Sequence, residues 1–185
     1  MSCSRGWDII RVRSLKQDLT LKLKFMQVKH IKKEMETVSK VADVKAVYSV
    51  KVPAKDRIQI KSPDAVYNIL RPFYMDSGFM EQKEIFSCLY LDRSNKILGM
   101  AKISEGSSCA TIVDIPYIFR LAILMNASSV ILCHNHPSGN LQASDADKQI
   151  TKKIIQAGGL FDIQIFDHLI ISSDGFLSMQ SEGLI

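Results

Sequence analysis

A short apolar run, Val130–Cys133, is bounded by Ser129 and followed at once by the polar segment His134-Asn135-His136-Pro137. A brief continuous apolar run of this kind is typical of a strand that is buried on both faces. Such a strand belongs in the middle of a sheet that is flanked by helices. The histidines must then lie at the end of that strand, so this run constrains both the fold and the position of a site.

Patterns from residue 57 onward predict alternating helices and strands. The predicted strands are 57–60, 84–91, 97–104, 129–134, 162–166, 168–172 and 176–179, and the predicted helices are 62–75, 116–127 and 144–157. Turn residues at 93–96 and at Asp174-Gly175 indicate two hairpins, so several strands must be antiparallel. The sequence therefore predicts an α/β fold with a mixed central sheet flanked by helices.

The boundaries of two of these helices have specific signals. Ser62 is expected to cap the first helix, with Pro63 at its first position. Its inward-facing residues are predicted to be Ala65, Ile69, Leu70 and Phe73. Gly158 and Gly159 are expected to stop the last helix.

Residues 1–55 are predicted to form a basic N-terminal extension, with a separate domain over residues 56–185. Helical spacing favours a helix over 24–40, and loose alternation suggests a strand over 44–52. Residues 1–61 hold 15 Lys and Arg against 6 Asp and Glu, whereas residues 62–185 hold 9 against 13. A basic arm on an acidic body suggests an anionic partner such as nucleic acid. An ordinary solvated charged face is the alternative, because the lysines over 19–25 alternate with apolar residues.

Composition and cysteine usage point to a cytoplasmic protein with no membrane partner. The 185 residues are 46% apolar and 23% charged, as in a soluble domain. No apolar run reaches the roughly 18 residues of a membrane span, and residues 1–13 lack the apolar centre of a secretory signal. The spacing of Cys3, Cys88, Cys109 and Cys133 matches no paired zinc motif, so reduced thiols are expected. Cys133 adjoins His134, but its apolar run favours a buried strand residue over a metal ligand.

The residues after the buried strand form a plausible metal site. His134 and His136 are two positions apart, so their side chains can point to the same side of an extended chain. Asp147 falls in the first turn of the next helix, whose N-terminus carries positive partial charge. Three protein ligands leave a fourth position for water, which is the arrangement of a catalytic zinc.

Each part of this pattern also has an ordinary structural explanation. Ser144 and Asp147, three residues apart at a helix start, fit a capping box in which the serine caps the backbone and the acid reaches back. Histidines at strand ends are often simple polar residues. The joint pattern at the end of an apolar strand nevertheless predicts a metal site.

The same residues resemble a known motif. A motif similar to the JAMM motif of the JAB/MPN metalloprotease superfamily is formed by His134-Asn135-His136-Pro137-Ser138-Gly139-Asn140 together with Ser144 and Asp147. Its residues are most similar to those of the bacterial RadC-like branch. The resemblance covers residues 60–184, and its further matches are Glu84-Ile85-Phe86, Leu91-Asp92, Glu105-Gly106 and Asp167-His168-Leu169-Ile170. It implies that residues 56–185 form a RadC-like JAB/MPN domain of cytidine-deaminase-like architecture.

The resemblance also implies a role for each matching residue. His134, His136 and Asp147 would bind Zn²⁺, and Ser144 would hydrogen-bond the oxyanion or the water. Glu84 would be the general base that takes a proton from the water and passes it to the leaving amine. Sequence position alone does not choose Glu84, because Glu81 and Glu105 are also available. The implied function is a zinc-dependent metallopeptidase or isopeptidase-type hydrolase that acts on a protein or peptide.

Two residues of the resemblance have less defined roles. His168 is expected to lie in the core beside the site, although an approach to the metal is the alternative. Asn135 could orient the loop or contact substrate, and the sequence does not decide between them.

The sequence also bears on functions other than hydrolysis. Longer RadC-like proteins carry an N-terminal helix-hairpin-helix region, whereas residues 1–55 are short for one and lack its glycine motif, so a short stand-alone form is expected. A DNA-associated protein of repair or recombination remains the alternative, supported by the basic extension and the family name. A non-catalytic scaffold is disfavoured because all five motif residues are present. Nucleobase deaminases need a His-x-Glu and a Pro-Cys-x-x-Cys motif, which do not occur here, and the loop after His136 does not follow an HNH nuclease.

Overall fold

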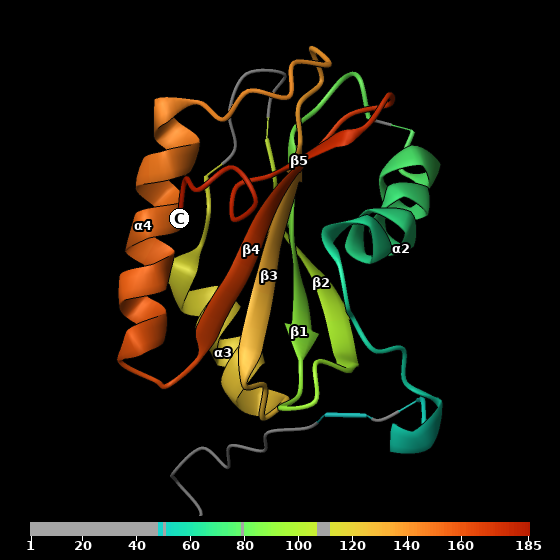
Figure 1. The fold of residues 1–185 in the computed structure, drawn as a ribbon, viewed down its shortest axis with the longest axis vertical. Coiled ribbons are helices and arrows are strands. Elements are labelled where there is room, and N and C mark those ends of the chain that lie inside the picture. The colour runs from blue at the N-terminus through green and yellow to red at the C-terminus, as the bar shows by residue number, and fades with distance from the viewer. Residues whose placement is uncertain (1–47, 50, 79, 107–111) are drawn as a thin grey trace, which may run out of the picture. The chain divides into compact units, whose positions relative to one another are not determined.

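The computed structural model describes residues 48–49, 51–78, 80–106 and 112–185 of the chain, within a unit that spans Ala46–Ile185 (Figure 1). The helix expected over 24–40 lies outside the described residues, as does much of the strand expected over 44–52. The described residues 48–49 and 51–52 are not in a strand. The strand expected over 57–60 is reduced to a single bridge from Gln59 to Lys96, after a short 3-10 helix, η1 (Ala54–Asp56).

Five strands form one mixed sheet in the order β2-β1-β3-β4-β5. In chain order the strands are β1 (Ile85–Leu91), β2 (Ile97–Glu105), β3 (Ser129–Asn135), β4 (Gln164–Ile171) and β5 (Phe176–Ser178). The pair β3 and β4 is parallel, and the other three pairs are antiparallel. The predicted α/β fold with a mixed sheet and two hairpins is confirmed.

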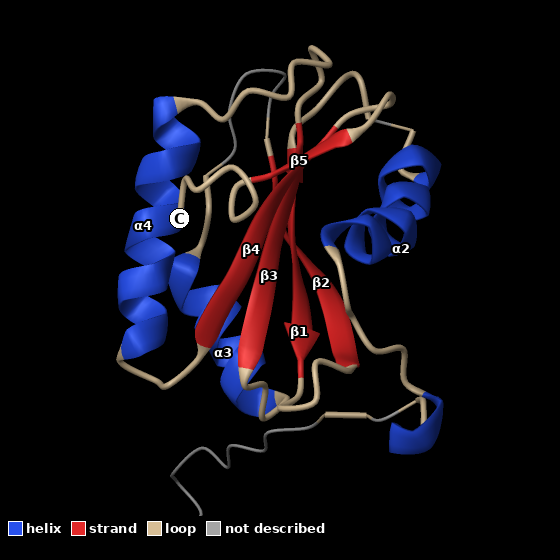
Figure 2. Cartoon of the chain, in the orientation of Figure 1, coloured by secondary structure: helices blue, strands red, loops and turns tan. Residues whose placement is uncertain are grey.

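Helices cover both faces of this sheet (Figure 2). Helix α2 (Pro63–Asp76) lies on one face, and α3 (Ile115–Leu124) and α4 (Asp145–Gly159) lie on the other. Every residue of β1 and of β3 is buried. The two central strands therefore have a hydrophobic core on each side, as the run Val130–Cys133 predicted.

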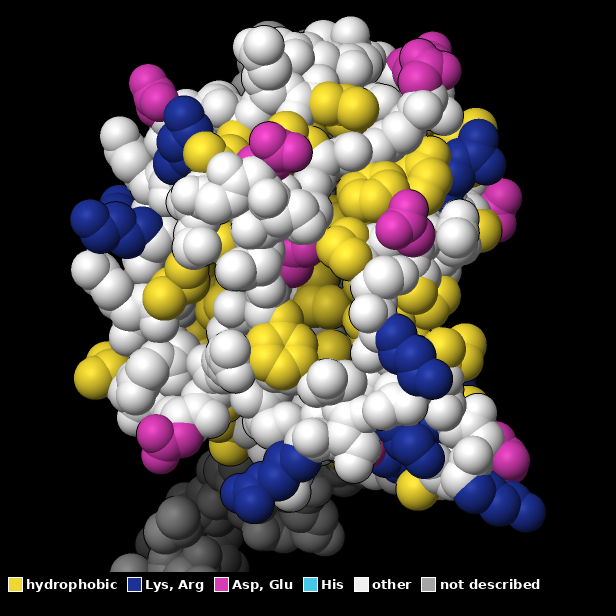
Figure 3. All heavy atoms as spheres, viewed as in Figure 1, with side chains coloured by type: hydrophobic (Ala, Val, Ile, Leu, Met, Phe, Trp, Pro, Cys, Tyr) yellow, Lys and Arg dark blue, Asp and Glu magenta, His cyan; other side chains and the backbone are white. Residues whose placement is uncertain are grey.

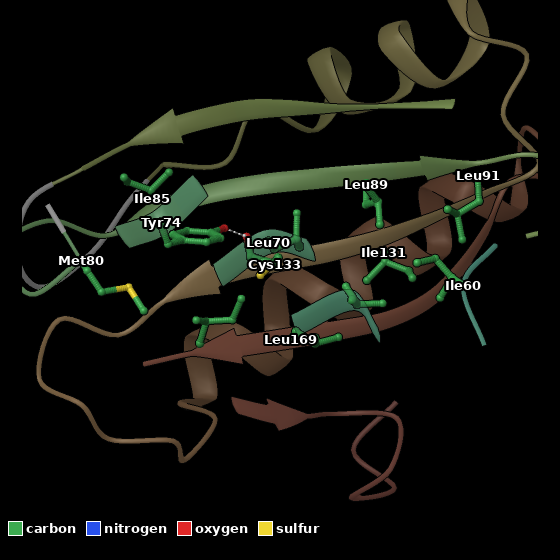
Figure 4. Packing of buried hydrophobic residues seen from close by; sticks show 12 residues of the cluster. Ile60, Leu70, Tyr74, Met80, Ile85, Leu89, Leu91, Ile131, Cys133 and Leu169 are labelled. Carbon is green, nitrogen blue, oxygen red and sulfur yellow. Dashed lines mark hydrogen bonds between the residues drawn. The ribbon is translucent and has the colours of Figure 1, made fainter. Parts of the chain in front are cut away.

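The inward face of α2 differs by one position from the predicted one. Val66, Leu70 and Tyr74 are buried, whereas Ala65, Ile69 and Phe73 are only partly buried. The Tyr74 ring lies among the core side chains, and its hydroxyl donates to the carbonyl of Cys133 at 2.9 Å (Figure 4). A tyrosine can bury its ring when its hydroxyl finds a partner, so the buried face of α2 includes Tyr74. The face predicted from apolar residues alone was therefore wrong by one position.

Strand β4 is continuous, although separate strands were expected before and after Asp167. Val130 of β3 pairs with Ile165 and Ile131 pairs with Asp167, so Phe166 is an extra residue that forms a β-bulge. The buried Asp167 carboxylate accepts hydrogen bonds from the His168 and Gln180 N–H groups and from the Ser178 hydroxyl. The aspartate that looked like a break is thus satisfied inside the strand.

The end of α4 corrects another expectation, because Gly158 and Gly159 belong to the helix instead of stopping it. A Cβ on Gly158 would lie 2.4 Å from the Ile163 carbonyl oxygen, so the glycine allows the chain to turn back closely under the helix. The left-handed residue that follows the helix is Asp162, with a φ of 53°. In the part of the chain that the structure describes, no helix has the length and apolar character needed to span a membrane.

The two glycines offer a matched test of this close approach. Gly158→Ala should lower the free energy of unfolding by about 1–3 kcal/mol, because the new methyl group must displace the backbone at Ile163. Gly159→Ala meets nothing within 4 Å and should be neutral or stabilising by up to about 1 kcal/mol. Urea denaturation of both variants measures the difference, and equal shifts would contradict the packing role of Gly158.

Candidate metal centre

The centre lies where β3 ends, at the edge of the sheet to which the N-terminus of α4 returns (Figure 1). His134 is the partner of Phe86 in β1 and of Ile170 in β4. The chain stays attached to β4 beyond the strand, because the His136 N–H donates to the Ile171 carbonyl at 3.0 Å. His134 and His136 therefore keep the extended spacing that turns both imidazoles to one side.

Two imidazole nitrogens and the carboxylate of Asp147 converge at this edge. The Nε2 atoms of His134 and His136 are 3.0 Å apart, and they lie 3.2 and 3.5 Å from the Oδ1 and Oδ2 atoms of Asp147, respectively. Ligands about 2.0–2.1 Å from a tetrahedral zinc are separated by about 3.3 Å, so these separations fit one ion. Among the described residues, this is the group of His, Cys, Asp and Glu side chains with metal-binding geometry.

Asp147 is also a helix-capping residue. Its Oδ2 accepts from the Ser144 N–H at 2.8 Å and from the Ser144 hydroxyl at 2.6 Å, and the Ser144 Oγ accepts from the Asp147 N–H. The expected capping box is therefore present. Capping and metal binding by Asp147 are compatible, since both hydrogen bonds from Ser144 end on Oδ2, which also lies 3.5 Å from His136 Nε2, whereas Oδ1 faces His134.

The charges around Asp147 favour its ionised form. Burial opposes ionisation, but the neighbouring imidazoles of His134 and His136 outweigh it and hold the pKa of this carboxyl well below its usual range. The hydrogen bond to Asp147 also raises the pKa of His136. An ionised carboxylate beside two imidazoles is the donor set that a divalent zinc ion prefers.

Glu84 lines the same cavity as His136, Ser144 and Asp147. This cavity has a volume of ≈ 520 Å³, and its apolar wall includes Phe86, Val113 and Ile150. Burial raises the pKa of Glu84, and the negative charge of Asp147 adds to this, while the two histidines oppose it. Glu81 is exposed, and Glu105 is paired with Lys83 at 3.0 Å and Lys102 at 2.7 Å. The geometry therefore distinguishes Glu84 from the two other acids.

Asn135, which lies between the two histidines, holds the segment that carries Glu84. Its side chain is fully buried; Oδ1 accepts from the Ile85 N–H, and Nδ2 donates to the carbonyls of Met80 and Lys83, all at 2.8 Å. Asn135 thus orients the chain before β1 and does not reach the cavity, which answers the question that the sequence left open.

His168 and Cys133 do not join the three converging donors. Cys133 points into the α2 side of the core, where burial raises the pKa of its thiol. The fully buried His168 bonds to His134 on the side away from Asp147, with 2.8 Å between His134 Nδ1 and His168 Nε2. Burial, followed by the neighbouring His134, lowers the pKa of His168 well below the usual value.

Sequence reasoning missed Thr151, whose hydroxyl bonds to both His168 and the Asp147 carbonyl. The available signal was its spacing of four residues from Asp147, which places both residues on one face of a helix.

The role of Asn135 can be tested by truncation. Asn135→Ala leaves an N–H and two carbonyls without their partner, so it should lower the free energy of unfolding by about 3 kcal/mol. Asn68→Ala is the control, because Asn68 is exposed on α2, and it should be neutral or stabilising by less than about 1 kcal/mol, since alanine has the higher helix propensity. Urea denaturation measures both, and a near-neutral Asn135→Ala would contradict the clamp.

Comparison with known proteins places this geometry in a family. The model of the RadC-like JAB domain matches residues 60–184. A UPF0758 protein of Flavobacterium johnsoniae is 43% identical over 135 residues, which are 71% of this chain and 57% of that protein. A UPF0758 protein of Syntrophomonas wolfei is 39% identical over 68% of this chain and 54% of its own length.

A third relative extends the similarity toward the N-terminus. The UPF0758 protein of Methanosarcina mazei is 34% identical over 189 aligned positions, which cover 99% of this chain and 77% of that protein. The chain spans little more than half the length of the Flavobacterium and Syntrophomonas relatives. The matched family model and these identities show that the chain belongs to the RadC-like JAB domain family.

Proposed function

We propose that this chain is a zinc-dependent hydrolase of the metallopeptidase or isopeptidase type, which cuts an amide bond in a protein or peptide. The observation that carries the proposal is the convergence of His134, His136 and Asp147 at tetrahedral separations beside a cavity that Glu84 also lines. Zinc, when bound, supplies a Lewis acid and lowers the pKa of a bound water to about 7.

Glu84 would act as the general base and then as the general acid. Its half-buried carboxylate lines the cavity and has a raised pKa. A base whose pKa is raised toward neutrality can both accept a proton from the attacking water and return it to the leaving amine. The sign of the shift means that the ionised, active form is lost at a higher pH than for an ordinary glutamate.

Ser144 would assist as a hydrogen-bond donor to the oxyanion or the water. It lines the cavity at the N-terminus of α4, where the helix dipole favours developing negative charge. Its hydroxyl hydrogen is directed to Asp147 Oδ2 in this structure, so this role requires the hydroxyl to rotate toward the substrate.

The cavity lining favours an amide over a phosphate-bearing substrate. Its described lining residues include Glu84 and Asp147 but no Lys or Arg. Lys and Arg are the usual partners of phosphate groups, and the N-terminus of α4 is the feature of this described lining that would favour an anion. An amide carbonyl needs a Lewis acid and a hydrogen-bond donor. The site is therefore better suited to hydrolysis of a neutral bond next to an apolar wall.

Glutamine substitutions separate metal binding from chemistry. The protein should bind about one zinc per chain, and Glu84→Gln should retain it while losing at least about 100-fold in rate, because the proton acceptor is gone. Glu105→Gln is the matched control and should retain both. Zinc content by mass spectrometry and cleavage of a library of quenched peptides with α-amide and lysine isopeptide bonds provide the measurements. A protein that binds no zinc with both histidines intact would overturn the proposal.

Nucleic-acid binding through the basic N-terminal region is the second candidate function, supported by the excess of Lys and Arg in residues 1–61. On the face shown in Figure 3, several Lys and Arg of the described residues gather toward the lower right, whereas most Asp and Glu lie in the upper half. If the extension binds DNA, the logarithm of affinity should fall steeply with the logarithm of salt concentration. Fluorescence anisotropy with a DNA duplex over a salt series tests this, and no binding at low salt would remove it.

A further inference from the structure

A line of buried hydrogen bonds leads from one proposed metal ligand to the backbone of another. His134 Nδ1 lies 2.8 Å from His168 Nε2, and His168 Nδ1 lies 2.6 Å from the Thr151 Oγ1 atom. Thr151 Oγ1 in turn lies 2.5 Å from the carbonyl oxygen of Asp147. His134, His168 and Thr151 are each at most 1% exposed, so these hydrogen bonds satisfy their buried polar atoms, and Thr151 Oγ1 has a further contact with the weak acceptor Met179 Sδ at 3.9 Å.

Only one arrangement of hydrogens along this line is compatible with a metal on His134. A neutral imidazole has one N–H and one bare nitrogen. If Nε2 gives its lone pair to the metal, Nδ1 must carry the hydrogen and donate it to His168 Nε2. His168 must then carry its hydrogen on Nδ1 and donate it to Thr151, whose hydroxyl hydrogen goes to the Asp147 carbonyl.

The reverse arrangement disfavours the metal. If the Thr151 hydroxyl donated to His168 Nδ1, His168 would carry its hydrogen on Nε2 and donate to His134 Nδ1. His134 would then have its own hydrogen on Nε2, which points toward His136 and Asp147. The Asp147 carbonyl opposes this reversal, because it can only accept and lies within reach of the Thr151 hydroxyl.

We propose that Thr151 and His168 are positioning residues, which hold His134 in the tautomer whose bare Nε2 faces the metal. This inference rests on the proposed zinc function and concerns residues outside its ligand set. A metal-bound histidine usually donates its second N–H to a carboxylate, carbonyl or water. His136 follows that rule, since its Nδ1 lies 2.6 Å from the Asn140 carbonyl. His134 instead relies on a second imidazole, which can accept or donate and therefore needs Thr151 to fix its direction.

Packing alone does not account for the arrangement. Phe86 stacks on His134, with 6.0 Å between ring centroids and 7° between planes, and it meets the His168 ring edge-on at 5.4 Å. These ring contacts fix the imidazole planes but are the same for either tautomer. The direction of the hydrogens is set by Thr151, and a change there can leave the ring packing in place.

A matched pair of variants tests the proposal. Thr151→Val keeps the shape of the side chain but removes the hydroxyl, whereas Thr151→Ser keeps the hydroxyl and removes a methyl group. Thr151→Val should weaken zinc binding by about 10-fold to 100-fold, as loss of the groups that hydrogen-bond a metal-bound histidine does, and Thr151→Ser should bind zinc nearly as the unmodified chain does. Competition of the full chain with a chromogenic zinc chelator measures the affinities.

A second readout does not depend on the variants. Long-range ¹H–¹⁵N spectra report which ring nitrogen carries the hydrogen, and His168 in the zinc-loaded, unmodified chain should carry it on Nδ1. A hydrogen on Nε2 of His168, or equal zinc affinity of Thr151→Val and the unmodified chain, would overturn this inference alone. Failure of the unmodified chain to bind zinc would overturn the proposed function, and this inference with it.

Discussion

The pairing of β1 with β3 is the constraint on which the rest of the structure depends. In this antiparallel register Phe86 faces His134, so the residues just before β1 lie beside the residues just after β3. Glu84 and His136, which are 52 positions apart in the sequence, are thereby brought to one cavity. Asn135 locks the same junction with three hydrogen bonds. Hydrophobic burial of both strands on both faces stabilises the register that the site requires.

The parts of the site that are local in sequence were predictable, and the parts that depend on register were not. His134, His136 and Asp147 lie within one strand, loop and helix start, so strand and helix geometry suffices to bring them together. Choosing Glu84 over Glu81 and Glu105 needed either the family resemblance or the strand pairing. The spacing of four residues between Asp147 and Thr151 was visible in the sequence, but the contact of Thr151 with His168 and the clamp by Asn135 were not, because side chains that bond to distant groups leave no periodic signal.

The same distinction accounts for the fold. Strand and helix positions followed from hydrophobic patterns, capping residues and turns, and the mixed sheet is as expected. The predicted face of α2 and the predicted break in β4 were wrong because a buried polar side chain finds its hydrogen-bond partners in residues distant in sequence. Tyr74 enters the core because its hydroxyl donates to the Cys133 carbonyl and accepts from the Ser87 hydroxyl. Asp167 stays in β4 because its carboxylate accepts from the Ser178 hydroxyl and the Gln180 N–H. Gly158 looked like a helix stop because the sequence does not show that Ile163 passes beneath it.

The bulge at Phe166 has a consequence for how β4 serves two cores. Side chains normally alternate along a strand, yet Ile165 and His168, three positions apart, both face the side of the sheet that carries α3 and α4. The extra residue shifts the phase of the alternation between them. In a strictly alternating strand, Ile165 and His168 would point to opposite faces. The bulge thus lets Ile165 pack in the core beside α3 and α4 while the His168 ring reaches His134 on the same face, and Leu169 and Ile171 still fill the core on the α2 side.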